Sequence, residues 1–255
     1  MDGWLRIVFP FFWVLLRTSG VLMTAPVVGT RYVPWTVKVA ISLVTGYILW
    51  SFVPAVDLPG TLEEMAVRAA GEVILGLFLG FIGTIMMAAI ETAGHLADME
   101  VGFGLANVVD PQYGQPSPLL GILKYLLVTL MFLAIDGHHI FIRALYDSFV
   151  LVPAGGATIP SSWAQVGIMA VSKMMWTALI LSCPVWASAL IVDITLGMIA
   201  RSVPQLNVFV VGMPLKTLVG LGIISASVTF YGVFTKDLVL SIKNLIDGLL
   251  GVFAR

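Results

Sequence analysis

The sequence predicts an all-α integral membrane protein of about six hydrophobic, partly kinked helices, with a long re-entrant-type loop at 101–118 and a C-terminal helical hairpin. Hydrophobic residues make up 59% of its 255 residues and charged residues only 11%, less than half of the about 25% charged residues typical of soluble domains. Four charge-free runs approach the roughly 20 residues with which a helix spans a bilayer. The stretch VGFGLANVVDPQYGQPSP, at 101–118, combines helix-breaking glycines and prolines with almost no charge.

The hydrophobic segments follow one another closely, so a single membrane-embedded domain, 1–255, is expected. The four charge-free runs and two charged candidates are, in order, 4–28, 39–56, 73–90, 117–135, 174–192 and 217–235. The stretch 148–172 is also uncharged, but its prolines and glycines favour a loop between helices. The tail 236–255 predicts an amphipathic helix, because its apolar residues share one helical face. Such a helix could lie on the membrane surface or dock on a partner.

Several charged residues fall within or at the edge of the hydrophobic segments: Arg17, Glu72, Lys124, Lys173, Asp193 and Lys216. A charge at bilayer depth costs about 3 kcal/mol even on a lenient scale. These residues therefore predict helix surfaces that face protein or a watery cavity, although snorkelling to the interface is open for Lys38 and Lys216. A stripe of small residues at every fourth position predicts close helix packing; its members are Gly76, Gly80, Thr84 and Ala88.

The sequence DGHH at 136–139 is the best candidate for chemistry. We expect Asp136 to act as a structural cap of a helix that runs through HHIFIRALYDSF, its carboxylate accepting backbone N–H bonds. A proton relay or a metal site is less favoured, since His138 and His139 would diverge on a helix and the only other histidine is His95. No nucleotide-binding, metalloprotease or nucleophile motif is present, so the sequence predicts no enzyme, no cofactor and no metal.

A polar stripe and a group of soft apolar residues flank the loop 101–118. Glu91, His95 and Asp98 share one helical face, which could line a wet channel, contact a partner or be a solvated helix end. The apolar residues are Met86, Met87 and Phe103. Their position beside a helix break suits either a packed core or the stopper of a gate.

Two stretches carry a resemblance to a known family. The block RSVPQLNVFVVGMPLK at 201–216 resembles the signature of FliR, the flagellar type III export-gate family, and relatives in the injectisome have a similar block. Residues 110–155, from DPQYGQPSP to LVPAG, are similar to the middle of that family. The segment 17–43, which begins RTSGVLMTAP, is similar to its N-terminal part. The likeness covers roughly residues 1–240.

The resemblance implies a structural and gating subunit of the channel in the bacterial inner membrane, at the flagellar basal body, through which unfolded flagellar proteins are secreted. It implies FliP-like and FliQ-like partner subunits, the export proteins FlhB and FlhA, membrane lipid around the complex, and no nucleic acid. Residues 1–160 would correspond to a FliP-like helical part, and 165–235 to a FliQ-like helical hairpin. An alternative is a proton-coupled small-solute transporter that uses Asp136, His138, Glu72 and Asp193.

The same resemblance assigns roles to individual residues. The family's plug loop matches 101–118, so the expected channel plug or gate residues are Gly102, Phe103, Gly104, Asp110, Pro111, Gly114, Met86 and Met87. We expect the turn at 201–216 to contact a partner, FlhB being the family's candidate. Its residues are Arg201, Pro204, Gln205, Asn207, Pro214 and Lys216. Pro204 and Pro214 would frame the turn, and Asn207 and Gln205 would bond its open backbone groups.

Overall fold

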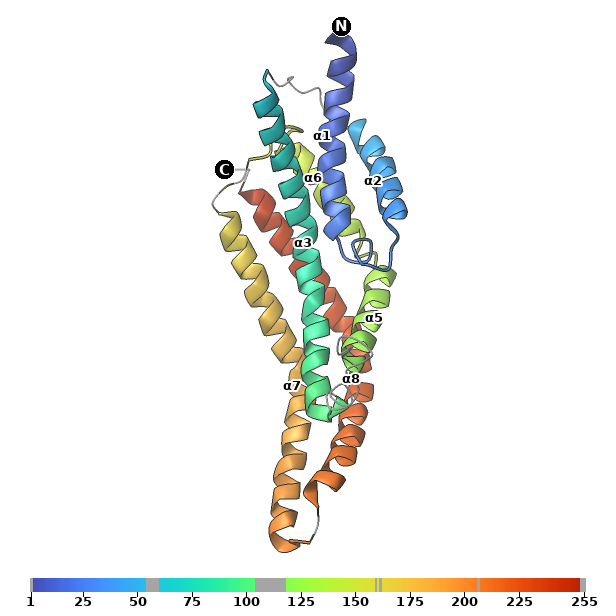
Figure 1. Ribbon diagram of the computed structural model, residues 1–255, viewed down its shortest axis with the longest axis vertical. Coiled ribbons are helices and arrows are strands. Elements are labelled where there is room, and N and C mark those ends of the chain that lie inside the picture. Colours follow the sequence, from blue (N-terminus) through green and yellow to red (C-terminus); the bar gives the residue numbers. More distant parts are fainter. Residues whose placement is uncertain are drawn as a thin grey trace. The chain divides into compact units, whose positions relative to one another are not determined.

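The computed structural model describes residues 2–53, 60–103, 118–158, 160, 162–205 and 207–252, with only the backbone for 2–7. In this part of the chain all regular secondary structure is helical (Figure 1). The helices are α1 (Asp2–Thr24), α2 (Trp35–Trp50), α3 (Leu62–Val101), α5 (Leu119–Ala134), α6 (His139–Leu151), α7 (Trp163–Ser202) and α8 (Val208–Gly251). The predicted all-α fold is confirmed, and each predicted hydrophobic segment overlaps a helix.

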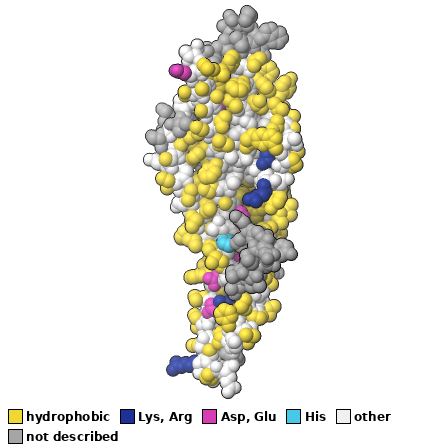
Figure 2. All heavy atoms as spheres, in the orientation of Figure 1, with side chains coloured by type: hydrophobic (Ala, Val, Ile, Leu, Met, Phe, Trp, Pro, Cys, Tyr) yellow, Lys and Arg dark blue, Asp and Glu magenta, His cyan; other side chains and the backbone are white. Residues whose placement is uncertain are grey.

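Among the described residues, three helices are long and apolar enough to cross a membrane: α3, α7 and α8. A fourth span results if α5 and α6, which a short break separates, are counted together. Helix α2 has 16 residues and is therefore about 24 Å long, less than the roughly 30 Å of a bilayer core. Hydrophobic side chains occur in patches along the face shown in Figure 2. The chain is therefore a membrane-embedded helical protein.

The contacts divide the chain into two compact units that interleave along the sequence. Unit 1 comprises Met1–Met86, Asp136–Val171 and Val239–Arg255, and unit 2 comprises Met87–Ile135 and Ser172–Leu238. Helices α3, α7 and α8 each contribute a segment to both units. The predicted division into 1–160 and 165–235 follows the family resemblance instead and stays a prediction.

In unit 1, the backbones of α1 and α3 approach closely where glycines replace side chains. A Cβ atom on Gly76 would lie 2.3 Å from the Arg17 carbonyl oxygen, and one on Gly80 would lie 2.5 Å from the Val21 carbonyl oxygen. The Thr24 hydroxyl lies 3.0 Å from the carbonyl oxygen of Leu77 on α3. The predicted small-residue stripe is therefore a helix-packing face at these positions.

In unit 2, the segments of α7 and α8 form an antiparallel hairpin around a short turn (Figure 1). Val185 on α7 and Ile224 on α8 share one buried cluster, and Leu196 contacts Gly212 nearer the turn. Helices α3 and α5 meet as closely as α1 and α3 do. A Cβ atom on Gly94 would lie 2.2 Å from the Gly121 Cα atom.

The predicted amphipathic tail 236–255 is helical as far as Gly251, but it is a continuation of α8. Helix α8 continues without interruption from Val208 to Gly251. The predicted apolar face is buried, with Leu238, Ile242 and Leu249 at most 2% exposed. Because this face packs inside the protein, the helix has no reason to break where the hydrophobic span was expected to end.

Candidate functional site

The last turn of α3 is fixed to α8 within unit 2. The Thr217 hydroxyl on α8 lies 2.9 Å from the Val101 carbonyl oxygen. Gly220 is packed so tightly against the same residue that a Cβ atom would lie 2.4 Å from Val101 Cγ2. The start of the predicted plug loop is therefore held on α8, the helix that also contains the end of the 201–216 motif.

The residues expected to form the plug lie partly within the described residues. Gly102 has a φ of +95°, a left-handed conformation that favours glycine. Phe103 is partly buried and packs against a cluster that contains Val101 and Ile224. Gly104, Asp110, Pro111 and Gly114 lie outside the described residues. The two methionines, Met86 in unit 1 and Met87 in unit 2, are each 1% exposed, which agrees with the packed-core alternative.

The predicted contact turn begins where α7 ends at Ser202 and is shorter than expected. The Asn207 side-chain oxygen accepts N–H bonds from Phe209 at 3.1 Å and Val210 at 3.4 Å, so this residue closes the first turn of α8 as predicted. Pro214 does not frame the turn but lies inside α8. A proline inside a helix loses one backbone hydrogen bond, and here the helix continues through it.

The exposed residues of this turn are a mixture of apolar and basic side chains. Arg201, Pro204 and Gln205 are exposed, and so are the large apolar residues Val203, Phe209, Val210 and Val211. Arg201 has no ion pair among the residues that the structure describes.

Lys216, one of the residues predicted to contact a partner, forms an ion pair within the chain. Its Nζ atom lies 2.7 Å from Asp193 Oδ2. Asp193 is on the facing helix of the hairpin, where the antiparallel arrangement places it opposite Lys216. These two charges in hydrophobic segments are therefore paired with each other inside the chain. The sequence alone did not show which groups they would face.

The turn before α6 differs from the prediction that Asp136 caps the helix. The N-cap position is occupied by His138, and no side chain makes a capping hydrogen bond. Asp136 has a φ of +58°, and its carbonyl oxygen, rather than its carboxylate, accepts the His139 N–H at 3.0 Å. The left-handed turn therefore closes the helix start with backbone oxygens and leaves the carboxylate 3.7 Å from His139 Nδ1.

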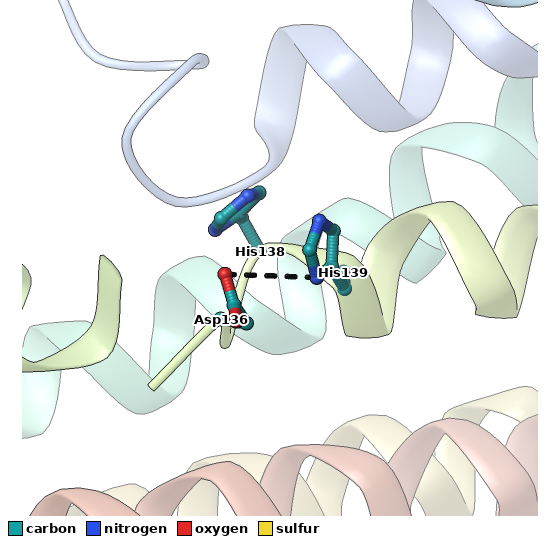
Figure 3. A group of neighbouring side chains, drawn as sticks. All are labelled: Asp136, His138 and His139. Carbon is teal, nitrogen blue, oxygen red and sulfur yellow. Dashed lines mark ion pairs between the residues drawn. The ribbon is translucent and has the colours of Figure 1, made fainter. Parts of the chain in front are cut away.

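This turn also holds the group of residues that could bind a metal. One ligand atom each from Asp136, His138 and His139 lies within 4.8 Å of the others. The two imidazole rings are tilted against each other, with centroids 4.3 Å apart. Figure 3 shows the three side chains grouped at the start of α6.

A buried ion pair in unit 1 was not predicted from the sequence. Arg17 Nε lies 2.6 Å from Glu72 Oε2, and Arg17 Nη2 lies 3.0 Å from Glu72 Oε1. Arg17 Nη1 also donates to the carbonyl oxygens of Ser148 and Val152, at 2.8 and 3.0 Å. The N–H of Gly155 donates to Glu72 Oε1 at 2.8 Å. The pair thereby joins α1, α3, α6 and the loop after α6.

The predicted polar stripe on α3 separates into exposed and buried residues. Glu91 and His95 are exposed, whereas Asp98 is only 2% exposed. The Asp98 carboxylate accepts the N–H bonds of Leu120 at 3.1 Å and Gly121 at 3.3 Å. Asp98 thus caps α5 from another helix, a role that no local sequence pattern reveals. Lys124, one turn further along α5, is 1% exposed and interacts electrostatically with Asp98.

Comparisons with known proteins agree with the resemblance. Residues 8–242 match the family described as bacterial export proteins, family 1. The chain is 38% identical to the flagellar biosynthetic protein FliR of Bacillus subtilis over 216 residues, which cover 82% of each chain. It is 30% identical to FliR of Escherichia coli over 249 residues, 98% of this chain and 95% of the relative.

A relative from a different secretion system also matches. The Yop proteins translocation protein T of Yersinia pestis is 31% identical over 149 residues, 57% of each chain. This match covers less of the chain than those to the flagellar proteins. The match over most of the length, together with the identity to the flagellar relatives, shows that the chain belongs to family 1 of the bacterial export proteins, the FliR family.

Proposed function

We propose that the chain is a structural and gating subunit of the flagellar type III protein export gate, located in the bacterial inner membrane at the flagellar basal body. Membership of the export family supports a component of the export apparatus. The names of the relatives from Bacillus subtilis and Escherichia coli favour the flagellar branch. In this role the segment 101–118 closes the channel, and unfolded flagellar proteins pass when it moves aside.

The observation that carries this proposal is that both ends of the segment 101–118 are held at one place in unit 2. Val101 is fixed on α8 through Thr217 and Gly220. At the other end, Asp98 on α3 holds the backbone of Leu120 and Gly121. A segment with a fixed base can be displaced and can return to the same position, as a plug must.

The composition of this segment supports its place in a narrow pore. A charged plug would hold water and leak ions, whereas VGFGLANVVDPQYGQPSP has a single charged residue, Asp110. Glycines provide backbone freedom and prolines prevent a stiff helix. Phe103 is the proposed apolar stopper, and Met86 and Met87 are the further gate candidates, whose deformable side chains are buried in the protein.

The exposed apolar surface of the long helices supports assembly with other membrane subunits. In the most apolar 18-residue stretches of α7 and α8, only 28% and 17% of the residues, respectively, are buried inside the chain. We propose that FliP-like and FliQ-like subunits and lipid cover this surface, with 1–160 as the FliP-like part and 165–235 as the FliQ-like hairpin. The turn at 201–216 would contact FlhB, with FlhA completing the apparatus.

The transporter alternative has little support from the described residues. Glu72 is paired with Arg17, and Asp193 is paired with Lys216. Neither carboxylate is left as a free proton carrier. Asp193 also belongs to a different unit from Asp136 and His138.

The test is the ion conductance of the assembled gate in planar bilayers. Residues 103–116 are replaced by a few Gly and Ser residues, so that the stopper Phe103 is removed while Val101 and Leu120 stay in place. A second variant carries a Gly/Ser segment of the original length, which separates the effect of length from that of composition. We expect both gates to assemble and to leak small ions, the short-loop gate more strongly. Near-zero conductance of a fully assembled short-loop gate would show that the segment is not the plug.

A further inference from the structure

The turn before α6 has the geometry and the ligand types of a metal site. We propose that Asp136, His138 and His139 bind a divalent transition-metal ion, with Zn²⁺ as the best match. The ligand atoms of the three residues lie within 4.8 Å of one another. Asp136 Oδ1 and His139 Nδ1 are 3.7 Å apart, close to the roughly 3.3 Å that separates two ligands in a tetrahedral site with bonds of about 2.05 Å.

The backbone explains how two adjacent histidines converge. Neighbouring residues inside a helix point in different directions, but His138 precedes α6 and His139 is its first residue. Asp136, with a φ of +58°, turns the chain back so that its carboxylate faces the histidines (Figure 3). A non-glycine residue in this conformation is uncommon and costs free energy. A bound ion would offset that cost.

The chemistry of the three side chains favours a zinc-like ion over Mg²⁺ or Ca²⁺. Imidazole nitrogens suit Zn²⁺ and its neighbours in the first transition series, whereas Mg²⁺ and Ca²⁺ require mostly oxygen ligands. His138 Nδ1 is buried and has no hydrogen-bond partner among the described residues. An ion bound through this nitrogen would supply the missing partner.

The surroundings provide room for solvent ligands and a suitable field. A cavity of about 190 Å³ adjoins Asp136 and His139, and a water molecule occupies about 30 Å³ in the liquid. The cavity is also lined by Asp147, Asp247, Arg143 and Lys243. With Asp136, its three carboxylates outnumber its two cationic side chains, which favours a bound cation. Water from the cavity would complete the coordination of the ion.

A bound ion would fasten the connection between α5 and α6. The helix start at His139 has no side-chain cap, so only backbone hydrogen bonds hold it now. Coordination by residues on both sides of the helix start would fix the left-handed turn. Because the three ligands come from one turn, the ion would stabilise the fold locally, and it has no part in the proposed channel.

The experiment measures metal binding by the purified full-length chain in detergent, after removal of any histidine tag. Co²⁺ is the spectroscopic probe, and Zn²⁺ affinity is obtained by competition. We expect one ion per chain. Replacing an outer-shell partner already costs about 10- to 100-fold in affinity, so His139→Ala, His138→Ala and Asp136→Asn should each weaken Zn²⁺ binding at least ~10-fold.

Two other residues serve as controls because they could bind a metal independently. The chain has three histidines and one cysteine, and His95 and Cys183 are both exposed. His95→Ala and Cys183→Ser should leave Zn²⁺ affinity and the Co²⁺ spectrum unchanged. Loss of the spectrum in either control, or unchanged binding in the triple variant of Asp136, His138 and His139, would overturn the proposal.

A measurement on the unaltered chain avoids any effect of the substitutions on folding. Zn²⁺ should protect His138 and His139 from modification by diethyl pyrocarbonate, and His95 should react equally with and without the ion. Equal modification of all three histidines in millimolar Zn²⁺ would overturn the proposal.

Discussion

Arg17 and Glu72 form two parallel charge-assisted hydrogen bonds, at 2.6 and 3.0 Å, and both side chains are fully buried. The guanidinium carbon also lies 4.1 Å from the centre of the Phe149 ring. Planar, two-point pairing of this kind is specific to arginine, because lysine offers a single charged point. The pair is therefore a determinant of how α1, α3 and α6 fit together.

Removing one member of this pair should destabilise the protein strongly. Arg17→Met leaves the Glu72 carboxylate buried without its partner, which typically costs about 3–5 kcal/mol. The double variant Arg17→Met/Glu72→Leu should recover only part of this loss, because both charges are gone but the carbonyl oxygens of Ser148 and Val152 and the N–H of Gly155 lose these partners. Chemical unfolding in detergent measures the difference. Glu64→Gln is the control, since Glu64 forms a partly exposed pair with Arg68; equal stability of Arg17→Met and this control would contradict the prediction.

Replacing Asp98 should loosen the first turn of α5. Asp98→Ala removes the acceptor of the Leu120 and Gly121 N–H bonds, and loss of a cap costs about 1 kcal/mol. Hydrogen exchange of residues 118–124 should become faster, while exchange in α7 stays the same. Glu91→Ala, at an exposed position on the same helix, should change neither. Unaltered protection of 118–124 in Asp98→Ala would mean that another group caps α5.

The Asp193–Lys216 pair should tolerate exchange of its charges. Lys216→Asp places two carboxylates opposite each other, and Asp193→Lys places two cations there, so each variant should reduce flagellar protein export. The exchange variant, with both substitutions, should restore it, although the pair contributes only about 0–1 kcal/mol because Asp193 is half-exposed. Export is followed by motility and by secreted flagellar proteins. A double variant as defective as Lys216→Asp would indicate that Lys216 also contacts a partner subunit.

Reversing the charge of Arg201 should affect export more than assembly. Arg201 is exposed beside the exposed Val203 at the end of the hairpin, and its charge is free to meet an acidic or carbonyl-rich surface. We expect Arg201→Glu to give a normal amount of purified gate complex with reduced export. Lys236→Glu, at an exposed position on α8 far along the chain from the turn, is the matched control. Failure of the Arg201→Glu gate to assemble would make the turn a packing element instead.

Local patterns in the sequence predicted several features correctly. Gly76 and Gly80 are four residues apart, so the sequence predicted that they share one helix-packing face, although it did not show which helix would pack there. Asn207 lies three residues after Pro204 and precedes an apolar run, and asparagine is a favoured residue at the start of a helix. Such signals need only neighbouring residues, and the structure agrees with them.

Features that depend on distant residues could not be predicted. Arg17 and Glu72 are separated by 55 positions, and nothing in either segment specifies the other. The close approach of Gly94 and Gly121 has the same origin. Pro214 was expected to frame the turn, but it lies inside α8, which continues past the hydrogen bond that a proline cannot make. At Asp136 the left-handed backbone, which sequence order does not reveal, replaced the expected side-chain cap.

The interleaving of the two units determines when each can be completed during synthesis. Unit 1 contains α1 and α2, yet it also includes Val239–Arg255, where Ile242 and Leu249 are fully buried. The ribosome makes this segment after the other parts of the unit. The first helices must therefore remain in the membrane without this neighbour until Val239–Arg255 has been synthesised, and a nascent chain released before that point would leave its first helices less protected from membrane proteases.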